Sequence, residues 1–173
     1  VENWKAAYGV KTTEKILEDF LTERPITVRC RTHKASLREI VTSLKSQGVT
    51  VEQAPYLPYA LKISDYNHIL TLETFLQGKI LVQDVSSMLV AEAASPKKGD
   101  HIIDMCAAPG GKSIHAADKM GDYGNVDARD VSQYKADLIK ENIHRTGVIN
   151  VEARVQDATV YDPDSEQAAD IVI

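Results

Sequence analysis

The sequence has few of the residues that cross-link a chain or anchor it in a membrane. Its 173 residues include two cysteines, Cys30 and Cys106, which belong to no Cys-x-x-Cys pair. This excludes a disulfide scaffold and a cysteine-rich zinc site, and it fits a reducing cytoplasm. No apolar run approaches the roughly 20 residues that a membrane-spanning helix needs. The first residues also lack the basic start and the apolar core of a signal peptide.

The composition, with 43% hydrophobic and 26% charged residues, is that of a globular protein and argues against a disordered chain. The five histidines show no metal-ligand spacing, so no metal is expected. The net charge of −5 is unevenly distributed. Residues 1–78 carry 10 Lys and Arg against 9 Asp and Glu, a net of +1, whereas residues 79–173 carry 10 against 16, a net of −6. The overall acidity argues against a general nucleic-acid binder but leaves room for a local basic patch.

Residues 1–78 predict a small α+β domain. A helical pattern that opens at residues 12–14 is ended by Pro25. The alternating segment 26–31 predicts a half-buried strand. Ser36, with Glu39 three residues later, predicts a helix that begins with a capping box. Two short strands are then expected, at residues 49–52 and 60–63.

Residues 79–173 predict a parallel α/β sheet. Strands alternate with helices, which is the pattern of βαβ units. We expect strands at residues 101–105, 125–129, 151–155 and 170–173, with helices at residues 112–119 and 132–145. The chain does not begin with Met, and it ends inside the apolar run 169–173. We therefore expect a truncated sheet that belongs to a longer protein.

A loop of small residues follows the first predicted strand of this sheet. It consists of Cys106, Ala107, Ala108, Pro109, Gly110, Gly111 and Lys112. In doubly wound sheets a ligand lies across the carboxyl ends of the strands, where glycines and free helix N–H groups let it approach the backbone. Asp130 follows the next strand, where a carboxylate can accept hydrogen bonds from ribose hydroxyls. Asp157 follows the third strand, from which an adenine amino group could be bound.

Three cofactor classes compete for this loop. A P-loop, GxxxxGK[ST], is excluded because its first glycine is missing, and the dinucleotide fingerprint GxGxxG is also missing. S-adenosylmethionine remains, since it needs a ribose carboxylate but no pyrophosphate loop. Each residue also has an ordinary interpretation: Gly110–Gly111 as a turn, Asp130 as a helix N-cap, Asp157 as a loop residue and Cys106 as a small buried hydrophobe.

The loop resembles the cofactor loop of the Nop/Sun-type RNA (cytosine-5)-methyltransferases. Residues 83–87, residues 124–130 with Lys135, and residues 155–158 are similar to other motifs of that family. The bacterial ribosomal RNA branch is the most similar. The resemblance implies a Rossmann-like S-adenosylmethionine methyltransferase sheet, truncated after its fourth strand and preceded by a small RNA-binding-type domain. It also implies that residues 106–112, Asp130 and Asp157 bind S-adenosylmethionine.

The resemblance also implies a chemistry, in which a cysteine thiolate attacks C6 of a cytidine in small-subunit ribosomal RNA and C5 takes the methyl group. The family's two catalytic cysteines fall beyond Ile173, and neither Cys30 nor Cys106 matches them. We therefore expect the chain to be inactive alone. The alternatives are a non-catalytic RNA-binding or ribosome-assembly factor with this fold and, disfavoured by the missing GxGxxG, a dinucleotide-dependent oxidoreductase.

A basic segment in the first domain suggests RNA contact. The segment 24–38 has five basic residues, while Glu23 lies just outside it and no acidic residue falls between residues 24 and 38. Arg29 and Arg31 share one face of the predicted strand because side chains alternate, and Lys34 follows them. These three residues could hold RNA phosphates, although charges also protect solvated edge strands.

Overall fold

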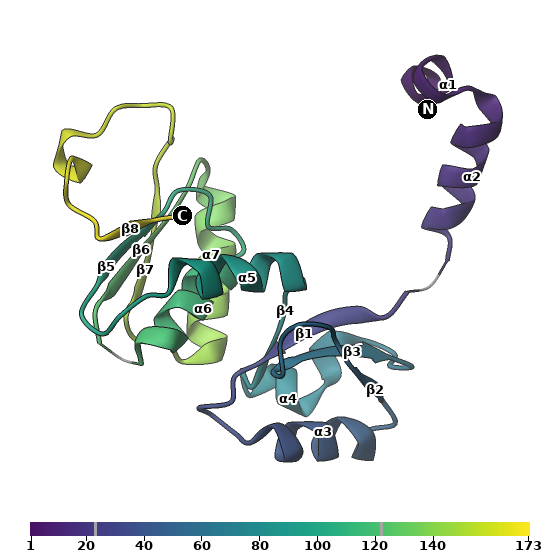
Figure 1. The fold of residues 1–173 in the computed structure, drawn as a ribbon, viewed down its shortest axis with the longest axis horizontal. Helices are drawn as coiled ribbons and strands as arrows, with labels where there is room; N and C mark the ends of the chain where they lie inside the picture. Colours follow the sequence, from purple (N-terminus) through teal and green to yellow (C-terminus); the bar gives the residue numbers. More distant parts are fainter. Residues whose placement is uncertain (23, 122) are drawn as a thin grey trace.

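Two four-stranded sheets organise the chain (Figure 1). The computed structural model describes residues 1–22, 24–121 and 123–173. The first sheet has the order β2-β3-β1-β4 and pairs its strands antiparallel. Its strands are β1 (Ile26–Cys30), β2 (Thr50–Gln53), β3 (Ala60–Ser64) and β4 (Ile80–Val82).

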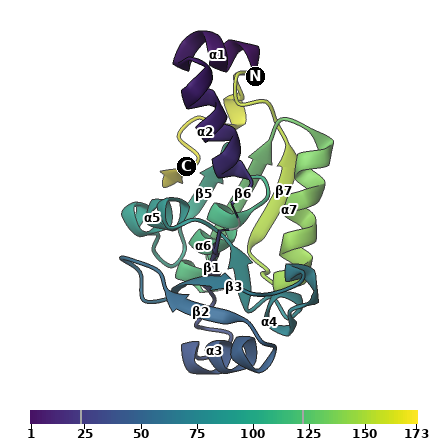
Figure 2. The ribbon, with the colours of Figure 1, turned by 90° about the vertical axis from the view of Figure 1, so that its right-hand side faces the viewer.

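Helix α3 (Leu37–Ser46) covers the face of the first sheet that lies away from the second sheet (Figure 2). Its predicted capping box is confirmed: the Ser36 hydroxyl accepts from the Glu39 N–H, and the Glu39 carboxylate accepts from the Ser36 N–H at 2.7 Å. Ile40 and Leu44 pack from this helix onto Val28 and Ile63 of the sheet. The short helices η1 (Ile69–Thr71) and α4 (Glu73–Leu76) lead back into β4.

Strand β4 belongs to both parts of the molecule. It pairs with β1, with Cys30 opposite Ile80 and Val28 opposite Val82. Ile80 joins the core of the small sheet, whereas Leu81 joins the core of the second sheet. The expected domain boundary after residue 78 therefore falls before a strand of the small sheet. An apolar strand that packs on both faces gives no sequence signal about which sheet it joins.

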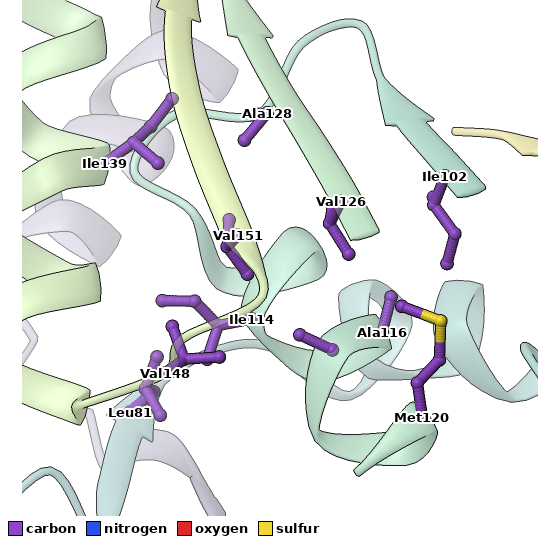
Figure 3. Close-up of a cluster of buried hydrophobic side chains, with 12 residues drawn as sticks. Leu81, Ile102, Ile114, Ala116, Met120, Val126, Ala128, Ile139, Val148 and Val151 are labelled. Atoms are coloured by element: carbon purple, nitrogen blue, oxygen red, sulfur yellow. The ribbon is translucent and has the colours of Figure 1, made fainter. Parts of the chain in front are cut away.

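The second sheet is parallel and has the order β7-β6-β5-β8. Its strands are β5 (His101–Asp104), β6 (Asn125–Asp130), β7 (Val151–Val155) and β8 (Ile171–Val172). Helices α5 (Val85–Ala94), α6 (Gly111–Met120) and α7 (Gln133–Thr146) accompany it, and η2 (Pro163–Ser165) precedes β8. Figure 3 shows Ile114 and Met120 of α6 and Ile139 of α7 packed with Val126 and Ile102 of the sheet. The α/β class expected from the sequence is confirmed.

Two helices precede the first sheet and project away from both sheets (Figure 1). They are α1 (Glu2–Tyr8) and α2 (Val10–Phe20). Gly9, with a φ of 77°, separates them, and the rings of Trp4 and Phe20 pack with their centroids 6.0 Å apart. None of the described helices is both long enough and apolar enough to cross a membrane.

Candidate cofactor-binding site

The loop at residues 105–110 joins the carboxyl end of β5 to the start of α6. Asp104, the last residue of β5, is fully buried beneath it. The Asp104 carboxylate accepts hydrogen bonds from the Cys106 N–H at 3.3 Å and from the Ser113 hydroxyl at 2.8 Å. The Lys112 ammonium lies 3.5 Å from the same carboxylate. One buried carboxylate therefore ties the beginning of the loop to the first turn of the helix.

The two loop glycines have different structural roles. Gly110 has a φ of 103°, and a Cβ atom there would lie 3.3 Å from the Cγ2 atom of Ile139. Glycine is required at this position for its backbone conformation and for the close approach of α7. Gly111 begins α6, and a Cβ atom there would meet Gln83 at an ordinary 3.6 Å. The glycine pair is therefore part of a packed strand-to-helix junction rather than a simple surface turn.

Asp130 lies beside this loop, as its position at the end of β6 predicted. Its Oδ2 atom accepts from the Ala108 N–H at 3.0 Å, and its Oδ1 atom accepts from the Val131 N–H at 2.8 Å. The Lys135 ammonium lies 3.0 Å from Oδ1. Burial raises the pKa of Asp130, but the Ala108 hydrogen bond and the Lys135 ammonium outweigh it and leave the pKa below its usual value. The carboxylate is therefore ionised at neutral pH.

Asp130 is not the N-cap of the helix that follows. That position belongs to Ser132, whose hydroxyl accepts from the Lys135 N–H at 3.4 Å. The Asp130 carboxylate instead binds the backbone of the loop that enters a different helix, α6. This contact removes the N-cap interpretation that the sequence left open.

Asp157 lies at the same edge of the sheet but makes only local contacts in the described part of the chain. Val155 pairs with Asp130 in the strand register, and the Gln156 N–H donates to the Asp130 carbonyl at 2.9 Å. The Asp157 carboxylate is exposed and accepts from the N–H and the hydroxyl of Thr159 at 2.9 and 2.7 Å. The structure therefore places Asp157 near the expected position without joining it to the loop.

Part of the predicted loop lines a hollow. It lies between the segment at residues 82–87 and the loop, and its lining includes Gln83, Asp84, Ser87 and Lys112. Cys106 is exposed, and its carbonyl accepts from the Lys112 ammonium at 3.0 Å. The lining also includes the loop residues Ala107, Ala108, Pro109 and Gly111.

Arg29 and Arg31 do not form the exposed basic strip expected from the sequence. Both are 2% exposed, and both bind Asp118 of α6. The Arg29 Nη1 atom lies 2.7 Å from Asp118 Oδ2, and the Arg31 Nη2 atom lies 2.6 Å from Asp118 Oδ1. Arg29 in β1 and Arg31 directly after it both face the second unit, so they are not placed to hold phosphates. Lys34 is exposed.

Two important residues were not among the site residues expected from the sequence. Asp104 could have been found as the polar residue that ends an apolar strand just before the loop. Asp118 carried no such signal, because a carboxylate in a helix is most often solvated. Its side chain is 7% exposed because the two arginines of the small sheet cover it.

Comparisons with known proteins define the class to which this fold and loop belong. Residues 91–173 match the family model described as 16S rRNA methyltransferase RsmB/F. Residues 1–69 match the ferredoxin-like domain of RsmF/B-like methyltransferases. The fold is thus a Rossmann-like methyltransferase sheet preceded by a ferredoxin-like domain. The chain belongs to the RsmB/F family, within the Nop/Sun group of RNA methyltransferases.

Individual relatives agree with this assignment. The probable ribosomal RNA small subunit methyltransferase B of Bacillus subtilis is 37% identical over 158 residues, 91% of this chain and 35% of the relative. The 26S rRNA (cytosine-C(5))-methyltransferase nsun-1 of Caenorhabditis elegans is 33% identical over 129 residues, 73% of this chain and 19% of the relative. The crystal structure of PH0851 matches with a TM-score of 0.82 and 32% identity, covering 99% of this chain and 39% of that chain. The chain therefore spans about a third of the length of the Bacillus subtilis relative.

Proposed function

We propose that this chain is the cofactor-binding part of an S-adenosylmethionine-dependent methyltransferase that modifies C5 of cytosine in small-subunit ribosomal RNA. The RsmB/F family model and the named activities of the relatives support the reaction and the RNA class. The main structural support for this cofactor is the Asp130 carboxylate, which is ionised and held against the backbone of the small-residue loop.

The Asp130 carboxylate can accept a further hydrogen bond, as binding of a ribose hydroxyl requires. A carboxylate offers about four acceptor sites, and among the described residues three donors approach this one: Ala108, Val131 and Lys135. The Lys135 side chain is 48% exposed and can move away without losing its hydration. Residues 106–112 would contact the rest of the cofactor, and Asp157 would bind the adenine amino group at the same edge.

The proposed methyl transfer requires a thiolate that adds to C6 of the cytosine and forms a carbon–sulfur bond. C5 then takes the methyl group from S-adenosylmethionine. Loss of the C5 proton finally breaks the carbon–sulfur bond and releases the thiolate. Cys30 is not suited to this role, because it is buried and its burial raises the pKa of the thiol to about 12. Cys106 lies within the cofactor loop. We therefore propose that neither thiol is the nucleophile and that the chain does not transfer methyl groups by itself. Lys34, which is exposed, remains a candidate RNA contact.

Calorimetric titration tests the cofactor assignment. We expect the chain to bind S-adenosylmethionine and not NAD. Asp130→Asn should weaken binding by about tenfold or more, because it removes a charge-assisted hydrogen bond. Asp137→Asn, an exposed position on α7, is the control and should bind as the unsubstituted chain does. Thermal melts would show that both variants fold. Equal affinity for NAD, or unchanged binding by the folded Asp130→Asn variant, would contradict the assignment.

A second assay tests the proposal that neither cysteine of this chain is the nucleophile. Small-subunit ribosomal RNA incubated with the chain and cofactor labelled in its methyl group should gain no label. Label on cytosine C5 that disappears in Cys106→Ser would show that Cys106 is catalytic and that the proposal about the thiols is wrong.

A further inference from the structure

One buried side chain of the small sheet, Arg29, forms hydrogen bonds to two segments next to the cofactor loop. The Arg29 Nε–H donates to the Gln83 Oε1 atom at 2.8 Å, and its Nη1 atom donates to Asp118 at 2.7 Å. Gln83 follows β4, and Asp118 lies in the last turn of α6. A single guanidinium of the ferredoxin-like domain therefore contacts two segments that border the loop.

Gln83 carries this contact to the loop itself. Its side chain lies against Gly111, the first residue of α6, and lines the hollow beside Ala107 and Lys112. The residue is 6% exposed. Because Arg29 binds the amide oxygen, it also determines which way the amide faces, and the Nε2 atom has no partner among the described residues. Arg29 thus supports α6 at its first residue through Gln83 and near its last residue through Asp118.

Arg31 provides a natural comparison. It is equally buried and also binds Asp118. Its Nη1 atom donates to the carbonyls of Gly78 at 3.1 Å and Thr146 at 2.6 Å, which lie away from the loop. Arg29 and Arg31 therefore share one anchor but differ in their second contact, and only Arg29 reaches Gln83.

We propose that Arg29 is a positioning residue that, through Gln83, holds the cofactor loop in the conformation that binds the cofactor. The expected effect on cofactor affinity rests on the proposed function, whereas the contacts of Arg29 with Gln83 and Asp118 do not depend on it. It predicts that the ferredoxin-like domain contributes to cofactor affinity without touching the cofactor. A guanidinium suits this role, because its several donors lie in a fixed plane and can bind two partners at once.

Amide hydrogen exchange of residues 106–113, measured without cofactor, tests the positioning directly, and calorimetric titration tests its effect on affinity. Gln83→Met keeps the side-chain length but removes the acceptor for Arg29. We expect it to speed exchange in the loop and to weaken S-adenosylmethionine binding, each by about tenfold, the usual effect of losing a hydrogen bond to a charged group. Arg29→Lys should act in the same direction.

Two controls separate positioning from general stability. Gln83→Glu keeps the acceptor for Arg29, so its loop should exchange nearly as in the unsubstituted chain. Arg31→Lys should lower the melting temperature but leave loop exchange unchanged. Equal effects of Arg29→Lys and Arg31→Lys on the loop, or no effect of Gln83→Met, would overturn the proposal. If the unsubstituted chain binds no S-adenosylmethionine, the proposed function fails, while loop exchange still decides whether Arg29 positions the loop.

Discussion

Two pairs of buried charged side chains, one from each sheet, have different surroundings. In the parallel sheet, Asp104 and Asp130 are the last residues of their strands, and each binds the backbone of the loop at the carboxyl edge. In the small sheet, Arg29 lies within β1 and Arg31 directly after it, and both face Asp118 across the junction between the two units. The first pair holds the loop at the edge where we propose that the cofactor binds, and the second joins one unit to the other.

The difference follows from topology. Parallel strands that are joined by helices bring their carboxyl ends to one edge, so a polar residue at a strand end has a predictable location. The surroundings of a charge in an antiparallel strand depend on which element packs against that face. Three changes test this contrast, in order of decreasing expected effect.

Asp118→Ala should give the largest effect. The substitution leaves two guanidinium groups buried without their partner, which costs about 3–5 kcal/mol in the free energy of unfolding. Urea unfolding followed by circular dichroism measures this loss. Asp137→Ala is the matched control, because its side chain is 53% exposed and its loss should cost less than about 0.5 kcal/mol. Similar losses in the two variants would mean that the arginine–Asp118 contacts do not hold the two units together.

Gly110→Ala should give an intermediate effect that is specific to the loop. The positive φ of Gly110 and the close approach of Ile139 both oppose a side chain, so we expect a loss of about 2 kcal/mol. Gly111→Ala is the matched control in the neighbouring residue, where a methyl group meets only ordinary contacts and alanine favours the helix. Thermal melts of the two variants measure the difference. Equal losses would contradict the assigned difference between the two glycines.

His115 should make the smallest contribution, and only in acid. It lies on α6, and Nε2 is 3.3 Å from the Tyr59 hydroxyl and 3.9 Å from Glu92. Burial, helped by the charge of Arg29, lowers the pKa of His115 from 6.5 to about 3, although Asp118 and Glu92 oppose this shift. The unfolded chain therefore takes up a proton below about pH 6.5 while the folded chain does not. The free energy of unfolding should fall as the pH drops through this window and stay flat above it.

The substitution His115→Gln isolates this contribution from those of the other histidines. Between pH 6.5 and 5 the unsubstituted chain should lose about 1–2 kcal/mol more than the variant does. Urea unfolding at the two pH values measures both losses. Parallel pH profiles would show that His115 is protonated in the folded chain as readily as in the unfolded chain.

The sequence predicted the parallel sheet well because its signals are local. Alternating strands and helices defined the sheet, and the loop at 106–112 and Asp130 lie where the strand ends placed them. The Ser36–Glu39 capping box is equally local, since both partners lie within one turn of the chain. Each of these predictions needed only the order of elements and the residues at their ends.

The contacts between the two units could not be predicted in this way. Arg29 and Arg31 alternate with apolar residues like solvent-facing charges, and nothing near them in the sequence identifies Asp118, 87 positions after Arg31, as their partner. The ionic pairing depends on which face of β1 meets α6, which is a property of the assembled fold. Asp157 is a partial case, because its strand end was predicted while its contacts to Thr159 were not.

The double membership of β4 has a consequence for how such proteins can be recombined. A crossover after residue 78 would replace β4 and leave β1 to pair with a foreign strand, whose alternate side chains must then fit both cores. A crossover after Gln83 would keep β4 with β1 but would part Arg29 and Arg31 from their own Asp118. The ferredoxin-like domain and helix α6 are therefore inherited best as one block, although 87 positions of sequence separate Arg31 from Asp118, where the two regions meet.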